Sequence, residues 1–176
     1  IAAVESFLGD GTRPLDPDVV SEGLALATSP GRLQLIGIEP TVLVDAAHNP
    51  HGARALAAAM QEYFDFEEIA IVLAVLGDKD AHGIVAELAP VATRFHVTRS
   101  QSDRAIPVHD LVDIVRGVVG DEATLEFDDF ASAIEGAREW AAEAPKRAVL
   151  VTGSITLIGE AIALADAGEW KGAPGG

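Results

Sequence analysis

The 176-residue sequence contains no cysteine, and aromatic residues make up only 5% of it. Without cysteine, the chain can form no disulfide and carries no thiolate nucleophile or metal ligand, which fits a reducing compartment. Residues Ile1 to Glu5 have neither the basic start nor the apolar stretch of a signal peptide. No apolar run reaches the roughly 20 uncharged residues that a membrane helix needs. These absences predict a soluble, cytoplasmic protein.

Basic residues are also scarce, because 12 Lys and Arg stand against 28 Asp and Glu for a net charge of -16. Such a charge repels polyanions, so neither nucleic acid nor an anionic membrane is expected as a partner. An anionic small ligand would need local cations to overcome the overall field. Four cations lie in or near predicted loops: Arg32, Lys79, Arg99 and Arg104.

Several catalytic motifs are missing as well. The sequence has no Gly-x-x-x-x-Gly-Lys-Ser/Thr loop and no glycine-rich dinucleotide fingerprint after a strand, so this chain alone is not expected to hold a triphosphate as a P-loop does. It has no Gly-x-Ser-x-Gly nucleophile elbow. The five histidines lack the spacing of metal ligands, and we expect no metal site.

What the sequence does contain is a repeated alternation of short β-rich runs and amphipathic helices from Arg32 onward. Strands are predicted at 32–36, 41–44, 69–75, 95–98, 124–127 and 148–152, and helices at 53–64, 84–89, 108–119, 130–140 and 154–165. The short turn at 37–40 makes the first two strands an antiparallel hairpin. This pattern predicts an α/β fold: a Rossmann-like, three-layer domain with a mostly parallel sheet of about six strands and one antiparallel edge strand.

The first 29 residues differ from this pattern. Residues 1–8 read as the end of a helix, a second short helix is predicted from Asp16-Pro17 to about Thr28, and Pro30-Gly31 then breaks the chain. We therefore expect residues 1–29 to be the tail of a preceding domain and a linker, and 30–176 to be the main domain. The glycine-rich segment 168–176 is expected to be flexible. Because the first residue is Ile rather than Met, we expect a fragment or a processed product.

Polar loops follow three of the predicted strands, at the edge where an open α/β sheet binds ligands. The first is Asp45-Ala46-Ala47-His48-Asn49-Pro50, in which Asp45 can accept hydrogen bonds from paired hydroxyls such as those of a ribose. Alternatively, Asp45 and Asn49 only satisfy N–H groups of the following helix. Lys79 stands beside a helix start that suits a carboxylate or phosphate, although an exposed turn lysine is also ordinary. Ser154 either caps the last helix or belongs to an anion site.

Five segments together resemble the C-terminal domain of folylpolyglutamate synthases and bifunctional dihydrofolate synthases, which belong to the Mur ligase superfamily. The segments are Pro30-Gly31-Arg32, Asp45 to Pro50, Asp78-Lys79-Asp80, Arg104-Ala105, and Val151 to Ser154 with Gly159-Glu160-Ala161. They occur in the family's order and at its spacing. Ala46 departs from the family, which often has glycine there.

The resemblance implies a ligase that joins a folate or dihydropteroate carboxylate to the amine of L-glutamate. ATP with Mg²⁺ would phosphorylate the carboxylate, the amine would attack the acyl phosphate, and ADP and phosphate would leave. By similarity, Arg32, Asp45 and Asn49 would contact ATP, while His48, Ser154 and Lys79 would hold glutamate, with His48 and Lys79 as the catalytic candidates.

The family's central P-loop ATPase domain, which holds most of the ATP and Mg²⁺ contacts, is a partner that this sequence does not contain. The fragment alone is therefore expected to be inactive, and residues 1–29 to be the end of that central domain. Two alternatives stay open: a Mur-type ligase acting on a cell-wall precursor, and a non-catalytic α/β binding module.

Overall fold

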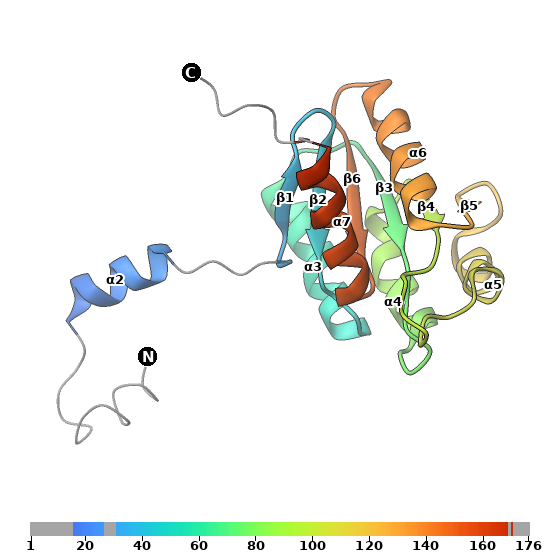
Figure 1. The fold of residues 1–176 in the computed structure, drawn as a ribbon, viewed down its shortest axis with the longest axis horizontal. Coiled ribbons are helices and arrows are strands. Elements are labelled where there is room, and N and C mark those ends of the chain that lie inside the picture. The colour runs from blue at the N-terminus through green and yellow to red at the C-terminus, as the bar shows by residue number, and fades with distance from the viewer. Residues whose placement is uncertain (1–15, 27–30, 169, 171–176) are drawn as a thin grey trace. The chain divides into compact units, whose positions relative to one another are not determined.

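The structure, a computed structural model, describes residues 16–26, 31–168 and 170. The chain divides into two compact units, 1–30 and 31–176. In the first unit, α2 (Pro17–Leu26) begins after Asp16, whose carboxylate accepts a hydrogen bond from the Asp18 amide at 2.9 Å (Figure 1). The helix predicted at 1–8 lies outside the described residues, as does most of the expected tail at 168–176. No helix in the described ranges combines the length and apolar character needed to cross a membrane.

The second unit is built on a six-stranded sheet in the order β1-β2-β6-β3-β4-β5 (Figure 1). β1 pairs with β2 antiparallel, and every other neighbouring pair is parallel. The mostly parallel sheet with one antiparallel edge strand is therefore confirmed. The strands are β1 (Gln34–Gly37), β2 (Thr41–Asp45), β3 (Glu68–Leu73), β4 (Arg94–Val97), β5 (Thr124–Glu126) and β6 (Arg147–Thr152).

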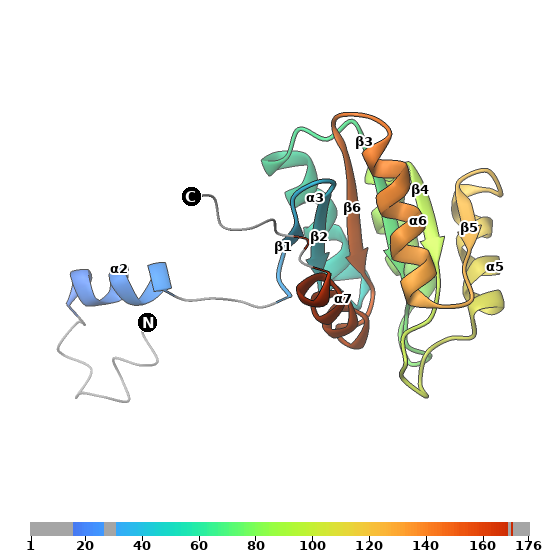
Figure 2. The same ribbon diagram turned by 45° about the horizontal axis from the view of Figure 1, so that its top comes forward.

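Helices cover both faces of this sheet and make it the middle of three layers (Figure 2). α6 and α7 bury one apolar cluster with the sheet, and α3, α4 and α5 bury a second cluster on the opposite face. The helices are α3 (Pro50–Tyr63), α4 (Ala81–Leu88), which continues into a short 3₁₀ turn (Ala89–Val91), α5 (Val108–Val119), α6 (Phe130–Ala142) and α7 (Ile155–Ala167). Because both faces are covered, the central strands β3 and β6 are buried almost along their whole length.

The predicted first strand differs from the observed one at its start. The sequence pattern predicts Arg32 and Leu33 in the strand, but β1 begins at Gln34. Gly31 has φ 72° and Leu33 has φ 41°, so the chain turns through the left-handed region before it becomes extended. The Leu33 amide donates to the Asp45 carboxylate at 2.8 Å, and this contact holds the turn against the end of β2.

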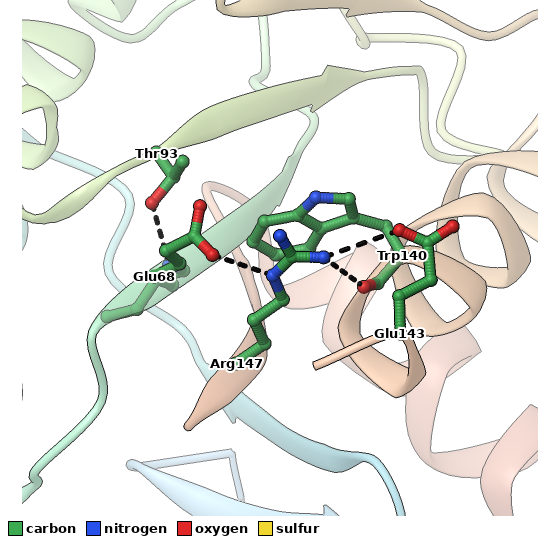
Figure 3. A network of polar contacts seen from close by, with 6 residues as sticks. Glu68, Thr93, Trp140, Glu143 and Arg147 are labelled. Carbon is green, nitrogen blue, oxygen red and sulfur yellow. Dashed lines mark hydrogen bonds and ion pairs between the residues drawn. The ribbon is translucent and has the colours of Figure 1, made fainter. Parts of the chain in front are cut away.

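Cationic and aromatic side chains stack at the amino-terminal edge of the sheet, and Figure 3 shows Arg147 against the Trp140 ring there. The guanidinium of Arg147 lies 4.4 Å and that of Arg94 4.5 Å from the Trp140 ring centroid. Arg147 also donates to Glu68 at 2.7 Å and to the Trp140 carbonyl at 3.0 Å. These contacts join α6 to the beginnings of β3, β4 and β6, and they leave the opposite edge for the polar loops.

Candidate functional site at the carboxyl edge of the sheet

The loops that follow β2 and β6 are joined through one carbonyl. The Ala47 oxygen accepts from the Gly153 amide at 3.0 Å and from Thr152 Oγ1 at 3.3 Å. Gly153 has φ 102°, and a Cβ placed on it would lie 2.5 Å from the Ala74 oxygen, just after β3. Only glycine fits such a position without strain. The ends of β2, β6 and β3 therefore form one continuous rim.

Asp45 is the last residue of β2, and its carboxylate bonds to the backbone on both sides. Oδ2 accepts from the Leu33 amide at 2.8 Å, and Oδ1 accepts from the Ala47 amide at 2.9 Å. The residue is only 9% exposed. Asp45 thus fixes the turn that carries the exposed Arg32, and the structure brings these two predicted residues together. Each carboxylate oxygen has a second lone pair that remains for a ligand.

His48 is half-buried in the same loop, and its ring orientation is set by a local contact. Nδ1 lies 2.9 Å from the Ala46 carbonyl oxygen. A carbonyl only accepts, so this bond assigns the hydrogen to Nδ1 and leaves the Nε2 lone pair of the neutral ring without a proton. The arrangement gives the site a hydrogen-bond acceptor at Nε2.

Asn49 and Ser154 both cap helices, as the local pattern predicted. Asn49 Oδ1 accepts from the Gly52 amide at 2.8 Å at the start of α3, and Pro50 takes the first helical position. Ser154 Oγ accepts from the Thr156 amide at 3.3 Å at the start of α7, and the residue is 1% exposed. Asn49 is therefore open to solvent at the rim, whereas Ser154 lies beneath it.

Lys79 lies in the loop after β3, next to the start of α3. A Cβ placed on Gly83, in the first turn of α4, would lie 2.6 Å from Pro50 Cγ, so the two helix starts are in contact. The Lys79 ammonium is 2.8 Å from Asp78, and Arg104 of the loop after β4 is 2.7 Å from the same carboxylate. The bond from Lys79 is the main reason that the pKa of Asp78 is lowered.

The sequence pattern points to Lys79, but it does not indicate that Lys79 shares the Asp78 carboxylate with Arg104. The two cations are separated by 24 residues along the chain, and no local pattern links them. A usable signal was present, however, because both residues belong to loops that follow neighbouring parallel strands.

A cavity of about 1120 Å³ lies elsewhere, between α7, the start of α6 and the loop after β4. None of the predicted site residues lines it. Arg99 is there, but the charged wall residues are otherwise carboxylates: Asp103, Asp128, Asp129 and Glu160. Such a wall suits an anionic ligand poorly, so the polar loops after β2, β3 and β6 are a better candidate for an anion site than this cavity. Among the described residues, no group of three or more acidic or histidine side chains gathers as metal ligands would.

Comparison with known proteins agrees with this architecture. The family model described as "Mur ligase, glutamate ligase domain" matches residues 31–155. A dihydrofolate synthase/folylpolyglutamate synthase of Mycobacterium tuberculosis is 39% identical over 92% of this chain and 36% of its own length.

Two solved structures are similar in fold as well as in sequence. The M. tuberculosis folylpolyglutamate synthase complexed with ADP and AMPPCP superposes with a TM-score of 0.88 at 39% identity, over 93% of this chain and 38% of that one. A bifunctional folylpolyglutamate synthase/dihydrofolate synthase with Mn, AMPPNP and L-glutamate bound gives 0.76 at 25%, over 89% and 36%. The chain thus spans a little more than a third of these relatives. It belongs to the Mur ligase family, in which it matches the glutamate ligase domain.

Proposed function

We propose that this chain is the C-terminal, glutamate-contacting domain of an ATP-dependent folate–glutamate ligase: a folylpolyglutamate synthase, a dihydrofolate synthase or both. It would work with a P-loop domain that precedes it in the same protein, residues 1–29 being the end of that domain. The observation that carries the proposal is the joining of the Asp45–Pro50 loop to the Gly153–Ser154 loop at one rim, within a domain of the glutamate ligase family.

The reaction proposed for the whole enzyme needs positioning more than new covalent chemistry from this domain. ATP would phosphorylate the folate or dihydropteroate carboxylate, ADP would leave, and the glutamate amine would attack the acyl phosphate and release phosphate. Holding the two reactants at the correct distance and orientation can supply several kcal/mol toward such a step. The similar bifunctional synthase that was solved with AMPPNP and L-glutamate bound supports this choice of ligands.

The side chains at the rim can be divided between the two ligands. Arg32, placed by Asp45, is an exposed cation suited to ATP phosphates. Asp45 would accept from the ribose, with the exposed Asn49 beside it. Mg²⁺ would be held mainly by the P-loop domain, as the resemblance to folylpolyglutamate synthases implies.

The glutamate side of the rim is built from three residues. His48 Nε2 has a free lone pair that can accept a hydrogen bond from the attacking amine. Lys79 offers an ammonium to a carboxylate. Ser154 would require the β6 loop to open slightly, since its hydroxyl is now buried and bonded to Thr156.

The proposal can be tested with the longer protein that carries this domain behind a P-loop domain. With ATP, Mg²⁺ and L-glutamate, it should form ADP and a glutamylated product from tetrahydrofolate or dihydropteroate, detected by mass spectrometry. The isolated 176-residue chain should show no turnover. Robust ATP-dependent ligation by the isolated chain would contradict the shared site, and activity only toward a muramyl-peptide precursor would favour the cell-wall alternative.

Two variants separate the ATP side from the glutamate side. Asp45→Ala should raise the KM for ATP more than that for glutamate, because it releases the turn that carries Arg32. His48→Ala should affect glutamate use more than ATP use. An unchanged KM and rate for ATP in Asp45→Ala would remove Asp45 from its assigned role.

A further inference from the structure

Asp78 is a single carboxylate that forms ion pairs with two cations. Its two oxygens contact two cations, Lys79 Nζ at 2.8 Å and Arg104 Nη2 at 2.7 Å. The other shared ion pairs in residues 31–168 have one cation and two carboxylates: Lys146 with Asp65 and Glu67, and Arg147 with Glu68 and Glu143. In a protein of net charge -16, this cluster is unusual because cations outnumber the carboxylate that they share.

The ion pairs are not needed to hold the two loops together. The Gly77 amide donates to the Arg104 carbonyl at 2.8 Å, and the Ile106 amide donates to the Val75 carbonyl at 2.9 Å. Leu76 and Ala105 form an antiparallel bridge between these bonds. An exposed ion pair adds at most about 1 kcal/mol to stability. The backbone therefore sets the approach of the loops, and the charged side chains extend from an already fixed frame.

The cations retain unused hydrogen-bonding capacity. The Arg104 side chain is 66% exposed and that of Lys79 31% exposed. An ammonium carries three N–H donors and a guanidinium carries five, and the Asp78 carboxylate takes one from each group. Most donors thus remain for a second carboxylate, which a planar guanidinium binds through paired hydrogen bonds.

Asp80 and Asp103 are close to the two cations in sequence, but neither carboxylate forms an ion pair with Lys79 or Arg104 among the described residues. Asp80 turns toward its own helix, where Oδ1 accepts from the Gly83 amide at 2.8 Å. Asp103, the exposed residue before Arg104, has no cation among its contacts in the described residues. Within the described part of the chain, Asp78 is therefore the one carboxylate that bridges Lys79 and Arg104.

The cluster also lies at the carboxyl edge of the sheet, next to the residues proposed to hold glutamate. His48 and Ser154 follow β2 and β6, while Lys79 and Arg104 follow β3 and β4, which come next in the strand order. The contact between Pro50 and Gly83 places the Lys79 loop beside the His48 loop. A ligand whose amine is held near His48 would thus extend its far end toward Lys79 and Arg104.

We propose that Arg104 and Lys79, positioned by Asp78, bind the side-chain carboxylate of the incoming amino acid. This inference rests on the proposed function and goes further, because it makes Arg104 the residue that selects an acidic amino acid over its neutral isostere. Glutamine has nearly the same shape as glutamate but lacks the side-chain charge, so the selection is electrostatic. Asp78 acts as a positioning residue that keeps the two cations side by side.

The test uses the full enzyme that contains this domain and compares Arg104→Gln with wild type. The loss of a charge-assisted bond predicts a rise in the KM for glutamate of roughly 10- to 100-fold. The preference for glutamate over glutamine should fall by a similar factor, while the KM for ATP and the thermal midpoint stay within error. Asp78→Asn should raise the KM for glutamate in the same direction and by less.

Two further variants complete the design. Arg116→Gln removes the same charge from an exposed pair with Asp121 at the far end of α5 and should leave every constant unchanged. Arg104→Lys keeps the charge but loses the planar fork, so it should retain part of the selectivity even if Arg104→Gln folds poorly.

The possible failures can be told apart. If the wild-type enzyme ligates glutamate but neither Arg104 variant changes the glutamate KM or the glutamate-to-glutamine ratio, the inference is overturned and the proposed function stands. If the wild-type enzyme ligates no glutamate to any folate acceptor, the proposed function itself fails.

Discussion

His96 should make the stability of this domain depend on pH between about 4 and 6.5. The residue lies in the middle of β4, is 2% exposed and stacks on Phe127 with ring centroids 4.9 Å apart. Nδ1 lies 3.1 Å from the Ala133 carbonyl, while Nε2 has no hydrogen-bond partner among the described residues. Burial disfavours the charged imidazolium and lowers the pKa of His96 from 6.5 to about 4.

The sign and size of the effect follow from linkage. The unfolded chain takes up a proton near pH 6.5, whereas the native ring resists it until about pH 4. The stabilisation is therefore fully present above pH 6.5 and is lost as the pH falls through this window. The whole difference corresponds to roughly 3 kcal/mol of unfolding free energy, of which about 2 kcal/mol should disappear between pH 7 and pH 5.

The measurement is urea unfolding of the chain at pH 7 and pH 5, followed by tryptophan fluorescence. Carboxylates also contribute to acid destabilisation, so the informative quantity is the difference between wild type and His96→Asn, which removes the titration and keeps an amide donor near the position of Nδ1. The variant should lose about 2 kcal/mol less than wild type over this interval.

A matched control is His109→Asn, because His109 is exposed on α5 and lies 3.7 Å from Asp113. Its pH dependence should follow that of wild type closely. Equal losses in wild type and His96→Asn would refute the reasoning, as would an NMR titration in which the native His96 ring takes up its proton near pH 6.5.

Two further predictions concern the opposite edges of the sheet. Arg147→Met removes the bonds to Glu68 and the Trp140 carbonyl and the stacking on Trp140, so urea unfolding should show a loss of about 2–3 kcal/mol; a loss no larger than that in Arg116→Met, which breaks an exposed pair, would contradict this role. Gly153→Ala forces a Cβ to within 2.5 Å of the Ala74 oxygen at φ 102°. It should cost more than about 1 kcal/mol in thermal unfolding, and a variant as stable as wild type would show that the loop adopts another backbone conformation.

Local features of the fold were predictable because they depend on neighbours along the chain. The spacing of apolar residues predicts the strands and helices. Caps such as Asn49 and Ser154 predict where helices start, because their bonding partners lie two or three residues away. The boundaries moved where a long-range contact intervened. Leu33 leaves the strand because its amide turns to Asp45, 12 residues later.

The candidate site shows the same division. The sequence by itself determined which polar residues follow which strands, and hence that Asp45, His48, Lys79 and Ser154 would meet at the carboxyl edge. It did not determine that β6, the last strand in the chain, inserts between β2 and β3, because strand order depends on how all the helices and strands pack together.

Only the tertiary structure decided the states of these side chains. It buried the Ser154 hydroxyl and gave Lys79 and Arg104 a common carboxylate. Charges and hydrogen bonds act over a few ångströms in space, whatever the separation along the chain, so Asp78 and Arg104, 26 positions apart, become partners only when the sheet aligns their loops.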